Sequence, residues 1–81
     1  MGEAVVILNF LSKNTQIDIA VPLEITANEF VVALNEAYKL GINTEDISKC
    51  YLRSENPIAL LKGDTSLKKY GIHNGSIINI D

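Results

Sequence analysis

Cysteine and histidine are almost absent from this chain, and with them most of the side chains that form reactive or metal-binding sites. Cys50 is the only cysteine, which excludes an internal disulfide, and His73 is the only histidine, so a zinc site lacks ligands at the usual spacing. An iron–sulfur centre would need four cysteines. A cysteine nucleophile needs a base nearby, whereas Cys50 falls at an inward position of a predicted strand and His73 falls in a turn. We expect no catalytic residue, no cofactor and no metal.

Basic charge and long apolar runs are also scarce. Seven basic and ten acidic residues give a net charge of −3, whereas a protein that binds nucleic acid needs a clustered positive face. The longest apolar run, Ala4 to Leu8, is too short to span a bilayer, and Glu3 stands where a signal peptide would be positively charged. We therefore predict a cytoplasmic protein that binds no nucleic acid and inserts into no membrane.

The rest of the composition is that of one small globular domain. Eighty-one residues leave no room for a second hydrophobic core, and 47% hydrophobic with 21% charged residues is ordinary for a folded protein. The sequence contains no internal repeat, linker or low-complexity segment. We expect a single domain over residues 1–81.

Two strands and a helix are predicted in the first half of the chain. Residues 4–11 favour a strand, and residues 15–23 alternate apolar and polar side chains, so the two should pair as an antiparallel hairpin. Thr26 and Glu29 form a capping box at the start of a helix of about fifteen residues, which Gly41 should end in the left-handed conformation. The apolar stripe expected on this helix is Phe30, Ala33, Leu34, Ala37 and Tyr38.

Three shorter strands are predicted in the second half. In residues 49–54, "KCYLRS", Cys50 and Leu52 should point inward, and residues 58–62 should form the next strand. Leu67 and Ile72 should anchor a turn, and Asn74-Gly75 should lead into a last strand with inward Ile78 and Ile80. This order predicts an α+β fold of the β-grasp type, in which a mixed sheet of four to five strands packs on one helix. The first and last strands should lie parallel and side by side.

The whole chain resembles ubiquitin in the order of its elements and in the segment "SLKKYGIHNGSIINI". The segments "IDIAVPLEITANEFVVAL" and "YGIHNGSIINI" resemble more closely the YukD/EsaB family of bacterial ubiquitin-like proteins. This resemblance implies a cytosolic accessory or regulatory component of the type VII (WXG-type, Ess/Yuk) secretion system of Gram-positive bacteria. It implies no enzymatic activity, and it implies a protein component of the secretion machinery as the partner.

The end of the sequence bears on the chemistry that ubiquitin and related sulfur carriers perform through a terminal glycine carboxylate. Such a tail must be flexible and free of side chains to enter an activating enzyme, whereas this sequence ends at Asp81, beside a predicted strand. We therefore expect a protein that is not conjugated. The alternatives are a covalent modifier or sulfur carrier whose Gly-Gly tail is absent from this sequence, and a ubiquitin-like adaptor of another assembly.

A binding protein needs an exposed surface, and the first strand is apolar on both faces. With Val6, Leu8 and Phe10 inward, Val5 and Ile7 point outward, and a register slip of one would still expose apolar side chains. We predict one contiguous apolar strip with polar flanks as the partner-binding site, in a monomer or weak dimer. The alternative is that scattered exposed apolar residues are ordinary. The predicted strip consists of Val5, Ile7, Tyr51 and Ile77, with Lys49 and Arg53 on its flanks.

Overall fold

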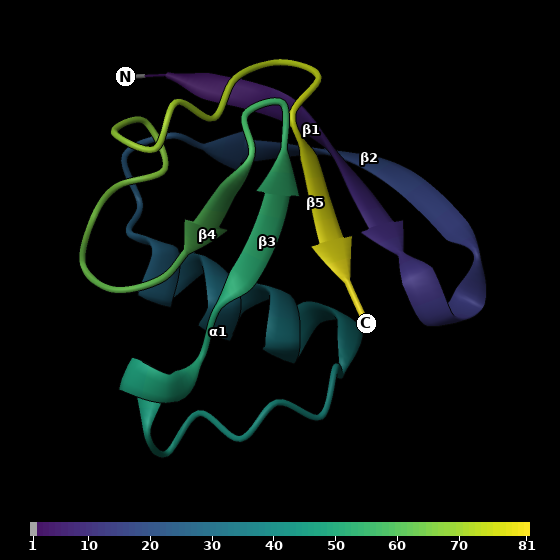
Figure 1. Ribbon diagram of the computed structural model, residues 1–81, viewed down its shortest axis with the longest axis vertical. Coiled ribbons are helices and arrows are strands. Elements are labelled where there is room, and N and C mark those ends of the chain that lie inside the picture. Colours follow the sequence, from purple (N-terminus) through teal and green to yellow (C-terminus); the bar gives the residue numbers. More distant parts are fainter. Residues whose placement is uncertain (1) are drawn as a thin grey trace.

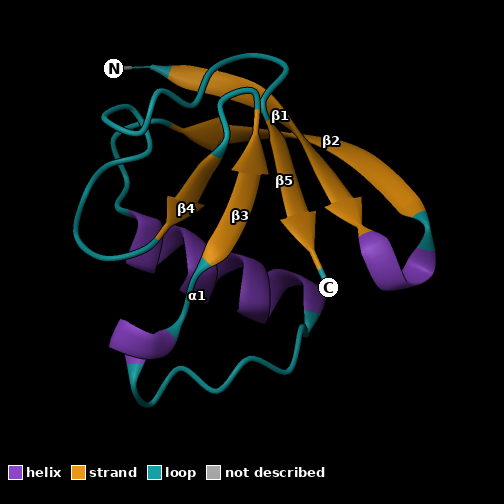
Figure 2. Cartoon of the chain, viewed as in Figure 1, coloured by secondary structure: helices purple, strands orange, loops and turns teal. Residues whose placement is uncertain are grey.

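One helix crosses one face of a five-stranded sheet in the computed structural model, which describes residues 2–81 (Figures 1 and 2). The strands are β1 (Glu3–Phe10), β2 (Thr15–Pro22), β3 (Leu52–Glu55), β4 (Ala59–Leu61) and β5 (Ile77–Ile80), and the helix is α1 (Ala27–Tyr38). Two short 3₁₀ segments, η1 (Leu11–Lys13) and η2 (Ile47–Lys49), lie in the connections.

The strand order β2-β1-β5-β3-β4 places the first and last strands beside each other at the centre of the sheet. They run parallel, and the other neighbouring pairs are antiparallel. The predicted β-grasp fold, with its mixed sheet on one helix, is therefore confirmed, and the number of strands is five. None of the helices described within residues 2–81 has the length and apolar character needed to cross a membrane.

The alternation of β1 decides which face of the sheet receives the helix. Val6, Leu8 and Phe10 are buried on the side of α1, as predicted, together with Ala4. On the last strand Ile78 and Ile80 are buried beside them, and the predicted inward positions Cys50 and Leu52 are also buried. The core that results also contains Val21, Phe30, Val31, Leu34, Leu61, Leu67 and Ile72.

The start of α1 is as predicted, but its buried face is rotated. The amide of Glu29 donates to the Thr26 hydroxyl at 3.1 Å, and the Glu29 carboxylate accepts from the Thr26 amide at 2.9 Å. Ala33 and Ala37, which were expected in the apolar stripe, are exposed. The helix turns Val31 inward instead, because a valine side chain removes more apolar surface from water than an alanine does. The stripe that packs on the sheet is Ala27, Phe30, Val31 and Leu34, with Tyr38 half-buried.

The helix also ends earlier than expected. It has 12 residues, and Lys39, with φ of 52°, is the left-handed residue at its end. Gly41 is left-handed as predicted, with φ of 76°, but it lies beyond the end of the helix. The side chain of Asn35 explains the early stop, since it donates to the Ile42 carbonyl and accepts from the Ile42 amide, both at 2.9 Å. These two bonds hold the chain against the last turn of the helix, so that it leaves the helix before Gly41 is reached.

The strands of the second half are shorter than predicted. The 3₁₀ turn η2 takes up Lys49, so that β3 begins only at Leu52. Two buried serines close the end of the sheet where β5 begins. The Ser54 hydroxyl donates to the Pro57 carbonyl at 2.8 Å, and the Ser76 hydroxyl donates to the Asn56 carbonyl at 2.7 Å.

Candidate interaction surface

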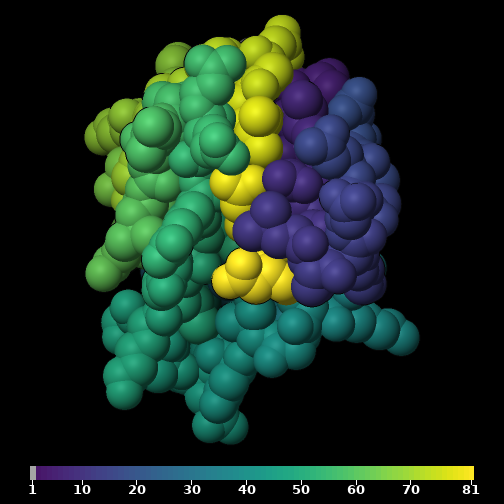
Figure 3. All heavy atoms as spheres, turned by 45° about the vertical axis from the view of Figure 1, so that its right-hand side comes forward, coloured from purple at the N-terminus to yellow at the C-terminus, as the bar shows by residue number. Residues whose placement is uncertain are grey.

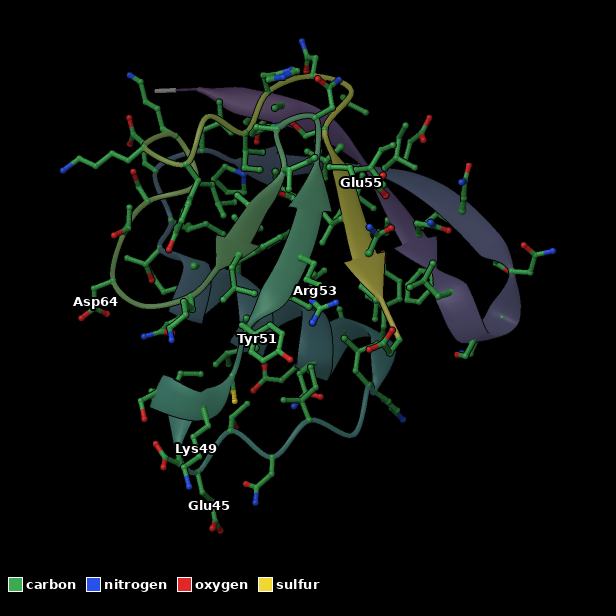
Figure 4. The ribbon with its side chains drawn as sticks, viewed as in Figure 1. Glu45, Lys49, Tyr51, Arg53, Glu55 and Asp64 are labelled. Carbon is green, nitrogen blue, oxygen red and sulfur yellow. The ribbon has the colours of Figure 1, made fainter. Side chains whose placement is uncertain are left out.

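The face of the sheet opposite α1, called here the outer face, is not covered by any other element of residues 2–81 (Figure 4). Strand register fixes which outward residues meet on it. Ile7 of β1 is paired with Asp18 of β2 on one side and with Ile77 of β5 on the other, and Ile77 is paired with Glu55 of β3. An apolar pair therefore lies at the middle of the sheet with a carboxylate at each end of its row.

Val5 extends this pair along β1. Val5 is 49% exposed, and Ile7 and Ile77 are each half-buried. Residues two positions apart on a strand point to the same face, so Val5 adjoins Ile7 on the outer face. The structure thus brings together three of the predicted residues, called here the apolar patch: Val5, Ile7 and Ile77.

The next row of the outer face is polar. The Asn9 side-chain amide donates to the Asn79 side-chain oxygen at 3.0 Å, and the Asn79 amide donates to the Glu55 carboxylate at 2.7 Å. Arg53 is paired with Asn79 in the same row. These hydrogen bonds join β1, β5 and β3 on the solvent side, so a row of polar side chains lies next to the apolar patch.

Tyr51 lies beyond this polar row, at the entry to β3, where Figure 4 shows it next to Arg53. Tyr51 is 47% exposed, and the Arg53 guanidinium carbon lies 5.9 Å from the centre of its ring, which is within the range of a cation–π contact. The two residues, called here the Tyr51–Arg53 pair, border a hollow at the C-terminal end of β5 that Leu11, Leu40 and Ile42 also line.

The predicted apolar strip is therefore not continuous. Glu55 is paired with Ile77 and Arg53 with Asn79, so Tyr51, which comes two residues before Arg53 and just outside β3, lies further still from Ile77. Lys49 is not on the sheet at all. It ends η2, its side chain is 83% exposed, and its ammonium lies 3.8 Å from the Asp46 carboxylate. Figure 4 shows Lys49 apart from Tyr51 and Arg53.

Sequence reasoning missed two exposed apolar residues near β4. Leu60 is 45% exposed and is paired with Arg53, so it ends the polar row at the edge of the sheet. Ile58 is 90% exposed in the turn before β4. Strand alternation would have found Leu60, because successive side chains on a strand point to opposite faces. With Leu61 buried in the core, Leu60 has to point outward.

The single cysteine and the single histidine of the sequence lie apart. Cys50 lies just before β3 and is 7% exposed, and its Sγ donates to the Asn43 carbonyl at 3.3 Å. His73 is exposed in the turn before β5, with its Nδ1 2.7 Å from the Asn74 carbonyl. Since β3 and β5 are antiparallel, these positions lie toward opposite ends of the sheet. Within residues 2–81, no group of three His, Cys, Asp or Glu side chains could hold a metal ion.

The space-filling view shows how the central strand reaches the surface (Figure 3). The C-terminal residues lie between the first strand and the segment around β3, so the outer face is made of segments far apart in the sequence. Its features come from three strands that meet only in the folded protein: the apolar patch from β1 and β5, and the Tyr51–Arg53 pair from β3 and its entry.

Comparison with known proteins gives a family and a fold. The family model of the WXG100 protein secretion system (Wss) protein YukD matches residues 5–80. The ubiquitin-like domain of the Mycobacterium tuberculosis type VII secretion system protein ECCD1 shares 18% identity with the chain, covers 99% of it and 98% of its own length, and has a TM-score of 0.57. No curated protein matches the chain.

Two solved ubiquitin-like domains from eukaryotes are similar as well. The C-terminal domain of mouse tubulin-specific chaperone e has 15% identity over 96% of this chain and 84% of its own, with a TM-score of 0.72. The domain of Plasmodium falciparum Dsk2 has 18% identity over 99% of this chain and all (100%) of its own, with a TM-score of 0.63. At these identities the solved structures show the fold alone, which is the ubiquitin-like β-grasp.

Proposed function

The chain belongs to the YukD family of the WXG100, or type VII, secretion system, and on this premise we propose that it is a non-enzymatic accessory protein that binds another protein of that apparatus. In this proposal it works in the cytoplasm of a Gram-positive bacterium and is not joined covalently to its partner. The observation that carries the proposal is the uncovered outer face of the sheet, with exposed apolar and aromatic side chains at two places.

The apolar patch suits the middle of a protein contact. A sheet needs only one face buried for stability, and here α1 already covers the other face. Val5 is about half exposed all the same, beside Ile7 and Ile77, and polar side chains lie in the next row and at both ends of the Ile7–Ile77 row. An apolar centre with a polar rim is the usual anatomy of a protein interface. Asp18 and Glu55 at the ends of the row favour a partner with basic groups at the matching positions.

The Tyr51–Arg53 pair suits an energetic anchor of the same contact. Tyrosine and arginine are enriched among interface residues that contribute most to binding, because each combines a large contact area with directional polar groups. The hollow beside the pair offers space for a partner side chain. We retain Lys49 in the proposal only as a charge at the periphery, since it lies outside the sheet.

The proposal also states that the protein has no enzymatic activity, and the surroundings of Cys50 and His73 support this. Cys50 is buried and hydrogen-bonded, and His73 lies toward the other end of the sheet, so the imidazole does not supply the thiol with a base. A buried free thiol is also compatible with the reducing cytoplasm.

Affinity purification of the tagged chain from its native host tests the binding surface. We expect Tyr51→Asp and Val5→Asp each to lower recovery of a secretion-system protein by at least about tenfold, since a buried unpaired charge weakens an interface by more than 1.4 kcal/mol. Ala33→Asp, on the exposed side of α1, is the matched control and should keep the partner. Circular dichroism confirms that each variant is folded. Equal recovery of the same partner by all three variants would refute the outer face as the contact.

Mass spectrometry of the same purified material separates binding from conjugation. The non-covalent proposal expects the intact mass of the chain alone after denaturation. A higher-mass adduct that survives denaturation, and that a specific protease removes, would show a covalent modifier instead. Recovery of partners from a different assembly, with no secretion protein among them, would point to an adaptor of that assembly.

A further inference from the structure

We propose that the free edge of β2 takes up an extended segment of a partner protein as an additional antiparallel strand. The segment would place apolar side chains toward Ile17 and Tyr38 and a basic side chain opposite Asp18. This edge lies at the side of the sheet, where no other strand or helix of residues 2–81 pairs with it (Figure 1). The inference concerns a second surface and does not rest on the proposed function.

The register of the hairpin shows which backbone groups of β2 are free. The Leu23 amide donates to the Gly2 carbonyl at 2.9 Å, and the pairing from Glu3–Pro22 to Phe10–Thr15 continues without a bulge. Because hydrogen-bonded pairs alternate in an antiparallel ladder, Ile17, Ile19 and Val21 face β1 with their amides and carbonyls. The backbone groups that point to the open edge are therefore those of Gln16, Asp18 and Ala20.

The bonds of β1 on its other side confirm this alternation. The Ile7 amide donates to the Ser76 carbonyl and the Gly75 amide donates to the Val5 carbonyl, both at 2.9 Å, so odd-numbered residues of β1 face β5 and even-numbered residues face β2. None of the backbone hydrogen bonds among residues 2–81 outside the strand ladders involves Gln16, Asp18 or Ala20. The edge thus offers three donors and three acceptors at strand spacing.

An apolar shelf lies along the same edge on the side of α1. Ile17 and Ile19 are only half-buried, although both pack against the core. Phe10 and Tyr38, whose ring centres are 5.4 Å apart, line a shallow depression together with Ile17. Alternate side chains of an added strand would point onto this shelf, as in other proteins that bind peptides at a sheet edge.

Three features select a peptide of a partner over a second copy of this chain. Asp18 is the only charged side chain among the outward residues of the edge, so a strand with a basic residue opposite it gains a cross-strand ion pair. A second copy brings another Asp18 to the same edge and a like net charge of −3. Pro22 also ends the row of edge donors, which limits the length of any pairing with another β2.

The opposite edge of the sheet is less suitable. β4 has three residues, and an edge that short offers too few hydrogen bonds to hold an added strand. β2 has eight residues. The length of the free edge therefore favours β2.

A short synthetic peptide, acetyl-Thr-Val-Lys-Val-Thr-amide, tests the edge directly. Its two valines would point to the shelf and its lysine would lie opposite Asp18. In the free protein we expect fast amide exchange at Gln16, Asp18 and Ala20 and slow exchange at Ile17 and Ile19, measured by NMR. Saturating peptide should slow the three fast amides at least about threefold, because a hydrogen bond protects an amide from exchange.

N-methylated peptides provide the matched control. In an antiparallel added strand the amides of lysine and threonine face β2, whereas those of valine face away. Methylation of the lysine and C-terminal threonine nitrogens should abolish the protection, and methylation of the two valine nitrogens should leave it. A peptide with glutamate in place of lysine should bind at least about threefold more weakly, and Asp18→Lys in the protein should reverse that preference.

Ala20→Pro removes one edge donor without touching the ladder to β1, because the Ala20 amide points outward. We expect this variant to bind the peptide at least about threefold more weakly, while Ala20→Val, which keeps the donor, binds as the unchanged protein does. Equal effects of the two methylation patterns, or binding unaffected by Ala20→Pro, would overturn the proposal. Protection that grows with protein concentration without peptide would assign the edge to a second copy and overturn it also.

Discussion

Replacement of Ser76 by alanine should destabilise the corner of the protein from which β5 starts. Ser76 is completely buried, at 0% exposed, and its hydroxyl joins two separate turns. It donates to the Asn56 carbonyl at 2.7 Å and accepts from the His73 amide at 3.0 Å. The turn between β3 and β4 and the turn before β5 are therefore held together by one side-chain oxygen, at the end of the sheet that carries Ile77.

The expected loss follows from the two groups that alanine would leave unpaired. A buried donor or acceptor without a partner costs about 1–3 kcal/mol. Both bonds of the Ser76 hydroxyl are part-buried, so water can satisfy some of the lost interaction and the lower part of that range applies. For two groups we expect a loss of about 2–3 kcal/mol. That is a large fraction of the about 5–15 kcal/mol by which natural domains are stable.

Urea unfolding followed by far-UV circular dichroism measures this loss, since the chain has no tryptophan to report by fluorescence. With a denaturant dependence of about 1 kcal/mol per molar urea for a small domain, the midpoint should fall by about 2–3 M. Ser54→Ala, which removes a bond of 2.8 Å and a long one of 3.5 Å from a buried hydroxyl, should cost about 1–2 kcal/mol. Ser48→Ala, at an exposed hydroxyl, should cost less than about 0.5 kcal/mol.

The comparison of Ser76→Ala with Ser48→Ala tests whether the buried hydroxyl stabilises the protein. If Ser76→Ala and Ser48→Ala shift the midpoint equally, the hydroxyl bridge contributes nothing, and apolar packing of β5 alone fixes this corner. A changed slope of the unfolding transition for Ser76→Ala would instead indicate an altered denatured state, and the midpoint could then not be read as a stability.

Three further outcomes test other parts of the fold. Lys39→Gly should stabilise the protein by about 0.5–1 kcal/mol, because glycine adopts the left-handed conformation at φ of 52° without strain, and destabilisation in a thermal melt would contradict this reading of the helix end. Leu67→Ala should cost about 2–5 kcal/mol, since Leu67 is 0% exposed, and a loss below about 1 kcal/mol in urea would show that the core closes around the cavity. Cys50 should react with a thiol reagent at least about tenfold more slowly in the folded protein than in denaturant, because only 7% of the residue is exposed, and equal rates would refute its burial.

Local patterns were sufficient for most of the elements. The alternation of β1 gave the correct inward residues, and the capping box of Thr26 and Glu29 gave the correct start of α1, because both depend on side chains within one element. The end of α1 was wrong because Asn35 bonds both backbone groups of Ile42, an interaction across seven residues that no helix-stop signal reports. The helical stripe was wrong at Ala33 and Ala37, since the rotation of a helix on a sheet depends on which side chains fill the space between them.

The strand faces of the candidate surface residues were predicted more reliably than their arrangement on the sheet. Tyr51, Arg53, Val5 and Ile77 lie on the outer face as the strand period predicts. Their separation into an apolar patch and a Tyr51–Arg53 pair depends on the register between β3 and β5. Neighbouring strands of this kind are joined by long connections, and the length of such a connection does not specify a register.

The sequence by itself determined where the strands and α1 form and which side chains of the strands point inward, because hydrophobic period, caps and turn residues act over a few positions. Only the tertiary structure decided that Ile7 meets Ile77, that a polar row isolates Tyr51, and that the backbone of Gln16, Asp18 and Ala20 is left unpaired. These outcomes follow from strand order and register, which are set by contacts between residues up to about seventy positions apart and are not carried by any local stretch of the chain.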